Sequence, residues 1–127
     1  MLAISKQPLL QALLLAIAIA FLSPTLVHAD TMPLTQSEIE EKIQSIPQWQ
    51  QEGQTITRTF EFKNFVEAIA FVDRLVEPAE AAAHHPDLAI SYNKVTVSLT
   101  SHDAGGLTEK DFALAQTISK IGQESDF

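Results

Sequence analysis

Three histidines that follow a glutamate could carry acid–base chemistry. Glu80 stands one helical turn before the adjacent pair His84 and His85. Pro86 follows the pair directly, and His102 comes later in the chain. Histidine can give and take a proton near neutral pH because its unperturbed pKa is about 6.5. A lone histidine is more often a surface or structural residue, but three together favour a site that transfers protons.

The local sequence predicts how these imidazoles leave the backbone. Pro86 disfavours a helical conformation for His85, so a helix that contains Glu80 must end near His84. The two neighbouring imidazoles should therefore point in different directions. His102 continues the alternation of the strand before it, so it belongs either to the polar face of that strand or to the loop just after it. The spacing allows the three histidines to converge on one pocket but does not require it.

The pattern does not match a metal site or a serine hydrolase. Neighbouring histidines before a proline are poorly arranged to share one ion, and no His-Glu-x-x-His or His-x-His pattern is present. No Gly-x-Ser-x-Gly elbow occurs. The chain also has no cysteine, which excludes a thiolate nucleophile, a zinc–thiolate site and a disulfide framework. We therefore expect no metal ion.

Three further residues each have two interpretations. Glu80 would share a helical face with His84 and could orient its imidazole or raise its pKa, or it could be an ordinary exposed carboxylate. Asp111 follows Thr108 at the spacing of a capping box, which is a structural role. Tyr92 could offer a stacking face, although aromatic residues on strands more often serve packing. These alternatives stay open on the residues alone.

The pattern around these positions predicts three helices and four strands. Capping boxes mark the start of the first and third helices, and an asparagine three residues before a glutamate marks the second. Apolar residues then recur at helical spacing, whereas alternating apolar and polar residues mark the strands. The predicted helices cover residues 35–46, 64–83 and 108–121, and the predicted strands cover residues 48–52, 55–62, 88–92 and 95–99.

The element order α-β-β-α-β-β-α predicts an α+β fold. Two hairpins separated by a helix suggest a four-stranded antiparallel sheet with three helices packed on one face. Pro78 is the one local conflict, because it removes a backbone donor inside the second helical stripe. The helix either kinks there, or ends early and restarts at Ala79.

The amino terminus has the features of a secretory signal peptide. Lys6 precedes an apolar run over residues 9–22, and Val27-His-Ala29 resembles the small-residue site before a cleavage point. The run is shorter than the roughly 20 residues of a spanning helix, so a retained membrane anchor is the weaker alternative. We expect residues 1–29 to be removed and residues 30–127 to form one compact domain with no stable membrane insertion.

The charge balance restricts the class of partner. The whole chain has a formal net charge of −8, and residues 1–29 hold one lysine and no acid, so the remaining domain is more acidic still. Nucleic acids and anionic membrane surfaces are bound by clustered lysine and arginine. The composition therefore argues against both as partners.

The residues from Glu80 to Asp111 resemble the signature of the pterin-4a-carbinolamine dehydratases. The matching pattern is Glu-x3-His-His-Pro-x5-Tyr-x9-His-x8-Asp. The flanking strings Tyr-Asn-Lys-Val at 92–95 and Leu-Thr-Ser-His-Asp at 99–103 are similar to that family too. The resemblance extends over roughly residues 34–121, which is nearly all of the expected domain.

The resemblance implies a hydro-lyase that removes water from 4a-hydroxytetrahydrobiopterin and gives quinonoid dihydrobiopterin. It also implies a four-stranded sheet with three helices on one side, no metal or other cofactor, and a homo-dimer or homo-tetramer. By position, the proton-transfer and pterin-binding residues would be His84, His85 and His102. The supporting residues would be Glu80, Pro86, Tyr92 and Asp111, with the two acids as partners of the histidines.

Dehydration needs a proton for the departing C4a hydroxyl and a base for the N5 proton. We hypothesise His85 and His102 as the main acid–base pair, with His84 positioning or assisting. The alternative is an exported, non-catalytic pterin-binding factor, or a protein-assembly or dimerisation factor of the same fold. The intact histidine set favours the enzyme. The leader predicts export to a periplasm or thylakoid lumen of a prokaryote, or membrane anchoring if it is not cleaved.

Overall fold

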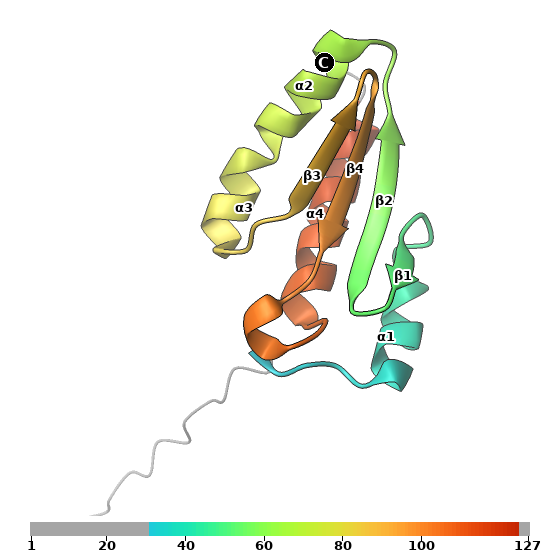
Figure 1. The fold of residues 1–127 in the computed structure, drawn as a ribbon, viewed down its shortest axis with the longest axis vertical. Helices are drawn as coiled ribbons and strands as arrows, with labels where there is room; N and C mark the ends of the chain where they lie inside the picture. Colours follow the sequence, from blue (N-terminus) through green and yellow to red (C-terminus); the bar gives the residue numbers. More distant parts are fainter. Residues whose placement is uncertain (1–30, 125–127) are drawn as a thin grey trace, which may run out of the picture.

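The computed structural model describes residues 31–124 (Figure 1). The predicted signal peptide, residues 1–29, lies outside the described residues. Within them, no helix is both long and apolar enough to cross a membrane. The elements in chain order are α1 Gln36–Ile43, β1 Gln50–Glu52, β2 Thr55–Glu61, α2 Phe65–Arg74, α3 Val76–Ala82, β3 Asp87–Ser91, β4 Lys94–Leu99, the short 3-10 helix η2 His102–Ala104, and α4 Glu109–Gln123.

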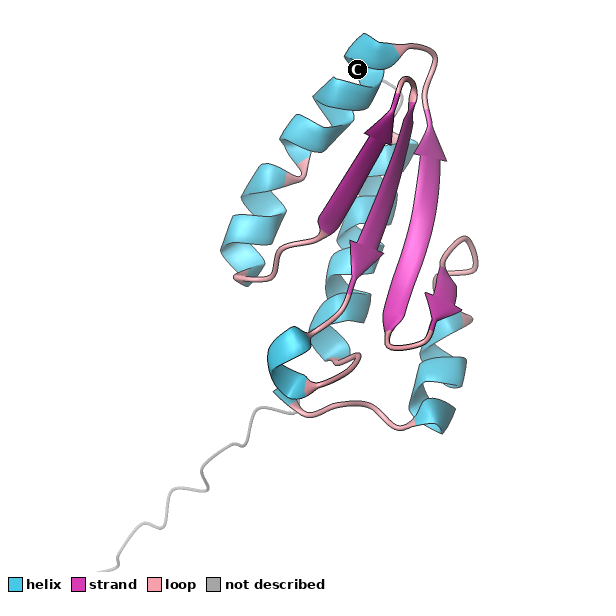
Figure 2. Ribbon diagram, in the orientation of Figure 1, coloured by secondary structure: helices cyan, strands magenta, loops and turns pink. Residues whose placement is uncertain are grey.

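The four strands form one antiparallel sheet in the order β1-β2-β4-β3. The longest pairing joins β2 to β4, and β3 forms an edge next to β4. One sheet face carries the buried side chains of the core, whereas the other carries cross-strand hydroxyl pairs such as Thr59 with Thr96, whose Oγ1 atoms are 2.9 Å apart. Figure 2 shows the helices along one side of this sheet. The predicted α+β fold is confirmed.

Aromatic side chains fill the centre of the core between the sheet and the helices. Phe71 of α2 has no exposed surface, and its ring lies 4.7 Å from that of Phe60 and 4.9 Å from that of Phe62, between ring centroids. Trp49 meets Phe60 edge to face at 6.3 Å. Burying such large rings is among the strongest contributions to domain stability. The core therefore fixes α2 and α4 against β2 and β4, and of these elements β4 and α4 lead into the site.

The second predicted helix is divided into α2 and α3, and the restart lies at Val76 rather than at Ala79. In a continuous helix the residue at position 78 would donate its N–H to the carbonyl of Arg74. Proline has no N–H, and its ring would clash with that carbonyl. The helix therefore ends at Arg74, and Pro78 lies in the first turn of α3, where no donor is needed.

Both predicted capping boxes are present. Thr35 accepts from the N–H of Glu38 at the start of α1, and the Glu38 carboxylate accepts from the N–H of Thr35 in return. Thr108 and Asp111 form the equivalent pair at the start of α4. The second box places a carboxylate at the end of the sheet where β4 also ends, which determines the position of the site.

Candidate active site

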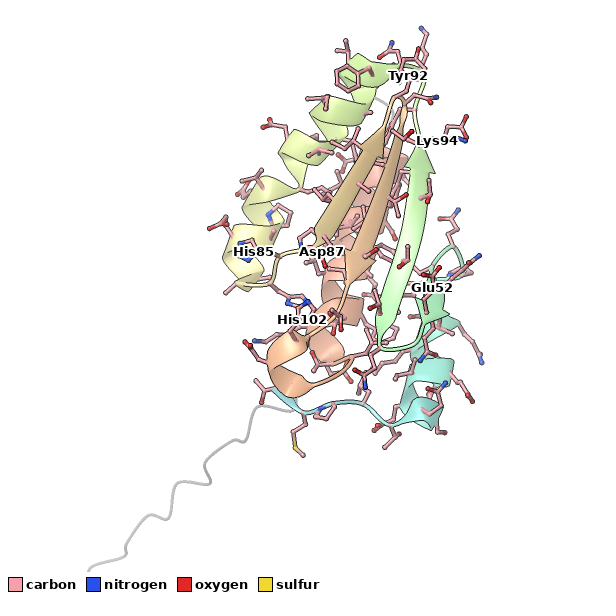
Figure 3. All side chains as sticks on the ribbon, in the orientation of Figure 1. Glu52, His85, Asp87, Tyr92, Lys94 and His102 are labelled. Atoms are coloured by element: carbon pink, nitrogen blue, oxygen red, sulfur yellow. The ribbon has the colours of Figure 1, made fainter. Side chains whose placement is uncertain are left out.

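The histidine cluster lies where α3 and β4 end and α4 begins. Figure 3 shows His85 and His102 at the same end of the molecule, on segments distant in the sequence. A cavity of about 370 Å³ is open between these segments. Its lining residues are Thr31, His84, His85, Thr100, Ser101, His102, Asp103, Ala104, Thr108 and Lys110. The structure therefore brings the three predicted histidines to one cavity.

A left-handed residue at the end of α3 separates the two neighbouring histidines. Ala83 has φ 47° and ψ 39°. Its N–H donates to the carbonyl of Glu80 at 3.1 Å, and the N–H of His84 donates to that of Ala79 at 3.1 Å. This is the Schellman arrangement that usually contains glycine. The reversal turns His84 toward the protein and leaves His85 on the surface. The two imidazoles therefore point in different directions, as Pro86 led us to expect.

His84 is held by a buried carboxylate. Its Nε2 lies 2.6 Å from Oδ1 of Asp111, with side-chain exposures of 11% and 0%. The other oxygen of Asp111 accepts from the hydroxyl of Ser101 and from the N–H of Thr108, each at 2.8 Å. An ionised carboxylate only accepts, so Nε2 of His84 donates and the tautomer of the neutral ring is fixed. Nδ1 is then the nitrogen available to take a proton.

His85 pairs with Glu80, whereas the helical spacing predicted that Glu80 would lie beside His84. Nε2 of His85 lies 2.6 Å from Oε1 of Glu80, and the two side chains are 61% and 68% exposed. The helical spacing that suggested the other pair ends at Ala83, whose left-handed backbone moves His84 off that face. An exposed pair of this kind is weak because water screens it.

His102 begins η2, in the loop just after β4, which was one of the two positions predicted for it. Its side chain is exposed and, in the described part of the chain, has no polar side-chain partner. The three imidazoles therefore differ in their partners. His84 binds a buried carboxylate, His85 binds an exposed carboxylate, and His102 binds no carboxylate in the described chain.

The structure places Tyr92 far from this cavity. It lies at the tip of the β3–β4 hairpin with φ 55° and a side chain that is 67% exposed (Figure 3). Pro86 is half-buried and lines a neighbouring apolar groove with Leu88 instead of the histidine cavity.

Two residues that the sequence reasoning did not select also belong to the site. Ser101 binds the buried carboxylate of Asp111, and Lys110 lines the cavity. Ser101 directly precedes His102, yet a serine in that place has no spacing signal of its own. Among the described residues, no three histidine or acidic side chains lie together as a metal site would require.

This fold and this histidine site define an α+β domain of the pterin dehydratase class. The chain belongs to the pterin 4 alpha carbinolamine dehydratase family, whose model matches residues 32–121. A protein of Picosynechococcus sp. that carries the family's name is 60% identical over 88 residues, which cover 69% of this chain and 96% of that protein. A namesake from Cyanothece sp. is 59% identical over 90 residues, 71% of this chain and 93% of that one.

A solved structure gives the same fold. It is described as a transcriptional coactivator/pterin dehydratase from Brucella melitensis. It shares 36% sequence identity with this chain, superimposes with a TM-score of 0.68, and the match covers 71% of this chain and 98% of that one.

Proposed function

We propose that the protein is a hydro-lyase that converts 4a-hydroxytetrahydrobiopterin to quinonoid dihydrobiopterin and water. The observation that carries the proposal is the His84–Asp111 pair, a fixed imidazole on a fully buried carboxylate, beside a cavity that two further histidines line. Membership of the dehydratase family and the names of the similar proteins support the same chemistry.

The reaction removes a hydroxyl from C4a and a proton from N5. The C4a–O bond breaks while an acid protonates the departing oxygen, and the electrons of the N5–H bond form the C4a=N5 double bond while a base takes the proton. A correctly placed acid or base typically contributes about 10²–10⁴-fold to a rate. A site for this reaction therefore needs at least two proton-carrying groups around the pterin ring.

His84 is best suited to take the N5 proton. Its Nε2 donates to Asp111, so its Nδ1 can act as the base. When Nδ1 takes a proton the ring becomes an imidazolium, and the adjacent buried carboxylate stabilises that charge. We therefore extend the hypothesis from sequence, in which His84 only assisted, and assign the base role to it.

His85 and His102 then serve the departing hydroxyl. Both line the same cavity from the solvent side, where water can leave and protons can be replaced. The exposed Glu80 orients His85. His102 has no such partner in the described chain, so the ring can rotate to follow the substrate.

The test is the dehydration rate of the purified protein with 4a-hydroxytetrahydropterin generated in the assay. We expect alanine at position 84 to lower kcat/KM by about 10²-fold or more, and alanine at 85 or 102 to lower it by a smaller factor. Unchanged rates in all three variants would rule out histidine catalysis. A wild-type protein that binds the pterin product without any turnover would instead indicate the non-catalytic factor.

We further propose that the protein is exported and that residues 1–29 are removed. Its support is the order of one lysine, an apolar run and a small-residue site. Fractionation of the source cells followed by mass spectrometry of the protein checks both points. A mass that retains residues 1–29 in the membrane fraction would favour the anchor, and an intact protein in the cytosol would contradict export.

A further inference from the structure

A second cavity lies at the other end of α4. It has a volume of about 470 Å³ and is open between the α1–β1 connection, β2 and the last two turns of α4. Ser119 lines it, whereas Asp111 of the histidine site lies at the start of the same helix. At 1.5 Å per residue these two positions are about 12 Å apart along the helix axis. The second cavity is therefore separate from the first.

The lining of this cavity is positively charged in an acidic protein. Arg58 and Lys120 line it together with serine and glutamine side chains, and no aspartate or glutamate does. The whole chain holds sixteen acidic residues against eight lysines and arginines. Other cations of the described chain do pair with acids, as Lys42 does with Glu109 at 2.8 Å. The described part of this cavity thus brings together two cations and no acid.

Arg58 is fixed in place but keeps most of its donors. Its guanidinium carbon lies 4.0 Å from the ring centroid of Phe60, and NH1 donates to Oγ of Ser119 at 3.1 Å. Among the described residues it meets no carboxylate. Burial lowers the pKa of Arg58 from its ordinary value, yet a guanidinium stays protonated at neutral pH. Four of its five N–H groups are therefore free for another acceptor.

The hydroxyl of Ser119 points to the same kind of ligand. Its oxygen accepts from Nε1 of Trp49 at 2.9 Å and from Arg58 at 3.1 Å. Both neighbours can only donate, so they use the two lone pairs of the oxygen. The hydroxyl proton then remains to be donated, and no acceptor for it occurs in the described chain. A guanidinium, an ammonium and a hydroxyl proton at one cavity match the oxygens of an anion.

We propose that this cavity binds a small oxyanion, a phosphate or carboxylate group, through Arg58, Lys120 and the hydroxyl of Ser119. The bound group would accept charge-assisted hydrogen bonds from the two cations and a further bond from the serine. This oxyanion site is independent of the histidine site, and we assign it no part in the dehydration reaction.

The test uses Trp49, the only tryptophan of the chain, as the reporter. Because its indole N–H donates to Ser119, an anion bound there should shift the single indole resonance in a ¹H–¹⁵N spectrum. The protein is titrated with inorganic phosphate and, separately, with succinate, while sodium chloride keeps the ionic strength constant. We expect a saturable shift that Arg58→Gln and Lys120→Gln each weaken about tenfold, because each loses a charge-assisted bond.

Lys63→Gln is the matched control, because it removes one exposed positive charge in the β2–α2 connection and should leave the affinity unchanged. Saturation by phosphate, by succinate or by both supports the site and identifies which oxyanion fits it. A linear response that is equal in wild type and variants would overturn the proposal and leave the two cations as partners of the helix C-terminus. Should Arg58→Gln fail to fold, the exposed Lys120 decides the outcome.

Discussion

His84 and His85 are adjacent in the sequence but experience different electrostatic surroundings. The carboxylate beside His84 is fully buried and accepts three hydrogen bonds, whereas the carboxylate beside His85 is mostly exposed. Charge interactions are strong where water is excluded and are screened at the surface. The two acids, Asp111 and Glu80, should therefore differ in importance although each lies 2.6 Å from its histidine.

Asp111→Asn tests the buried pair. An amide cannot accept from His84 and from Thr108 with both of its atoms, so either the histidine loses its acceptor or the cap of α4 does. We expect kcat/KM for dehydration to fall by about 10²-fold or more and unfolding free energy to fall by about 1–3 kcal/mol. Kinetics and urea unfolding measure the two effects. Asp73→Asn, on the exposed side of α2, is the control. If the fraction of unfolded protein accounts for the whole rate loss of Asp111→Asn, Asp111 has no role in catalysis beyond stabilising the fold.

Glu80→Gln tests the exposed pair. The amide oxygen can still accept from His85, and the lost charge was already screened by water. We expect kcat/KM to change by about threefold or less, which corresponds to well under 1 kcal/mol. A loss as large as that of Asp111→Asn would show that substrate binding excludes water from Glu80.

At the scale of elements, the end of α3 determines which histidine faces inward. Ala83 has a left-handed backbone, which glycine adopts without a steric cost. Ala83→Gly should therefore raise the free energy of unfolding by up to about 1 kcal/mol and leave both histidines in place. Ala82→Gly is the control, because its backbone is helical and the change should cost about 0.5–1 kcal/mol. Urea unfolding compares the two variants. A lower free energy of unfolding for Ala83→Gly would show that the left-handed backbone of Ala83 is not strained.

The start of α1 should make stability depend on pH. The N–H and hydroxyl of Thr35 both donate to Oε2 of Glu38 at 2.7 Å, and these bonds lower the pKa of Glu38 below its ordinary value. A lowered pKa in the folded state gives stability above the unfolded pKa and loses it as pH falls through the folded pKa. Glu38→Gln should thus be less stable than wild type at neutral pH and equal to it in strong acid. Unfolding at several pH values checks this, with Glu41→Gln as the control that removes an exposed charge from the same helix and leaves the capping box intact.

The elements were predictable because their signals are local. The capping boxes at Thr35 and Thr108 and the alternation in the strands occur within a few residues, and the structure confirms them. The partner of Glu80 was not predictable, since it depends on an alanine in a conformation that usually marks glycine. The turn beside Tyr92 was predictable, since strands were expected over residues 88–92 and 95–99. Its separation from the histidine cavity was not, because it depends on how the hairpin of β3 and β4 lies in the whole sheet.

At the scale of the whole molecule, the edge strand β3 leaves an apolar surface open. Every residue of β3 is exposed, and only β4 pairs with it in the described chain. Leu88 and Ile90 are 39% and 42% exposed, although they stand opposite Val97 and Val95 and so share the face of the core. An unpaired strand edge beside exposed apolar side chains is a template for association.

We propose that a second copy of the chain covers this edge. Antiparallel pairing of β3 about a two-fold axis through Ala89 would set Leu88 against Ile90 of the partner subunit, and both are apolar. The only charge in the strand, Asp87, would meet Ser91 of the partner subunit rather than a second carboxylate. The pairing is therefore complementary in both backbone and charge, which supports a homo-dimer as the first step of assembly.

Ile90→Lys tests this assembly, because it would place a charge in the centre of the paired edges and weaken association by at least about tenfold. Sedimentation velocity over a range of protein concentrations should show a dimer or larger species for wild type and a shift toward monomer for the variant. Gln54→Lys adds the same charge at the exposed β1–β2 turn and should leave the wild-type distribution unchanged. A wild-type protein that stays monomeric at the highest concentration would contradict the dimer. An Ile90→Lys variant that assembles as wild type does would show that the contact between subunits lies elsewhere. Because Ile90 does not line the histidine cavity, dehydration by the variant separates assembly from catalysis. Unchanged kcat/KM in a monomer would show that each subunit holds a complete site.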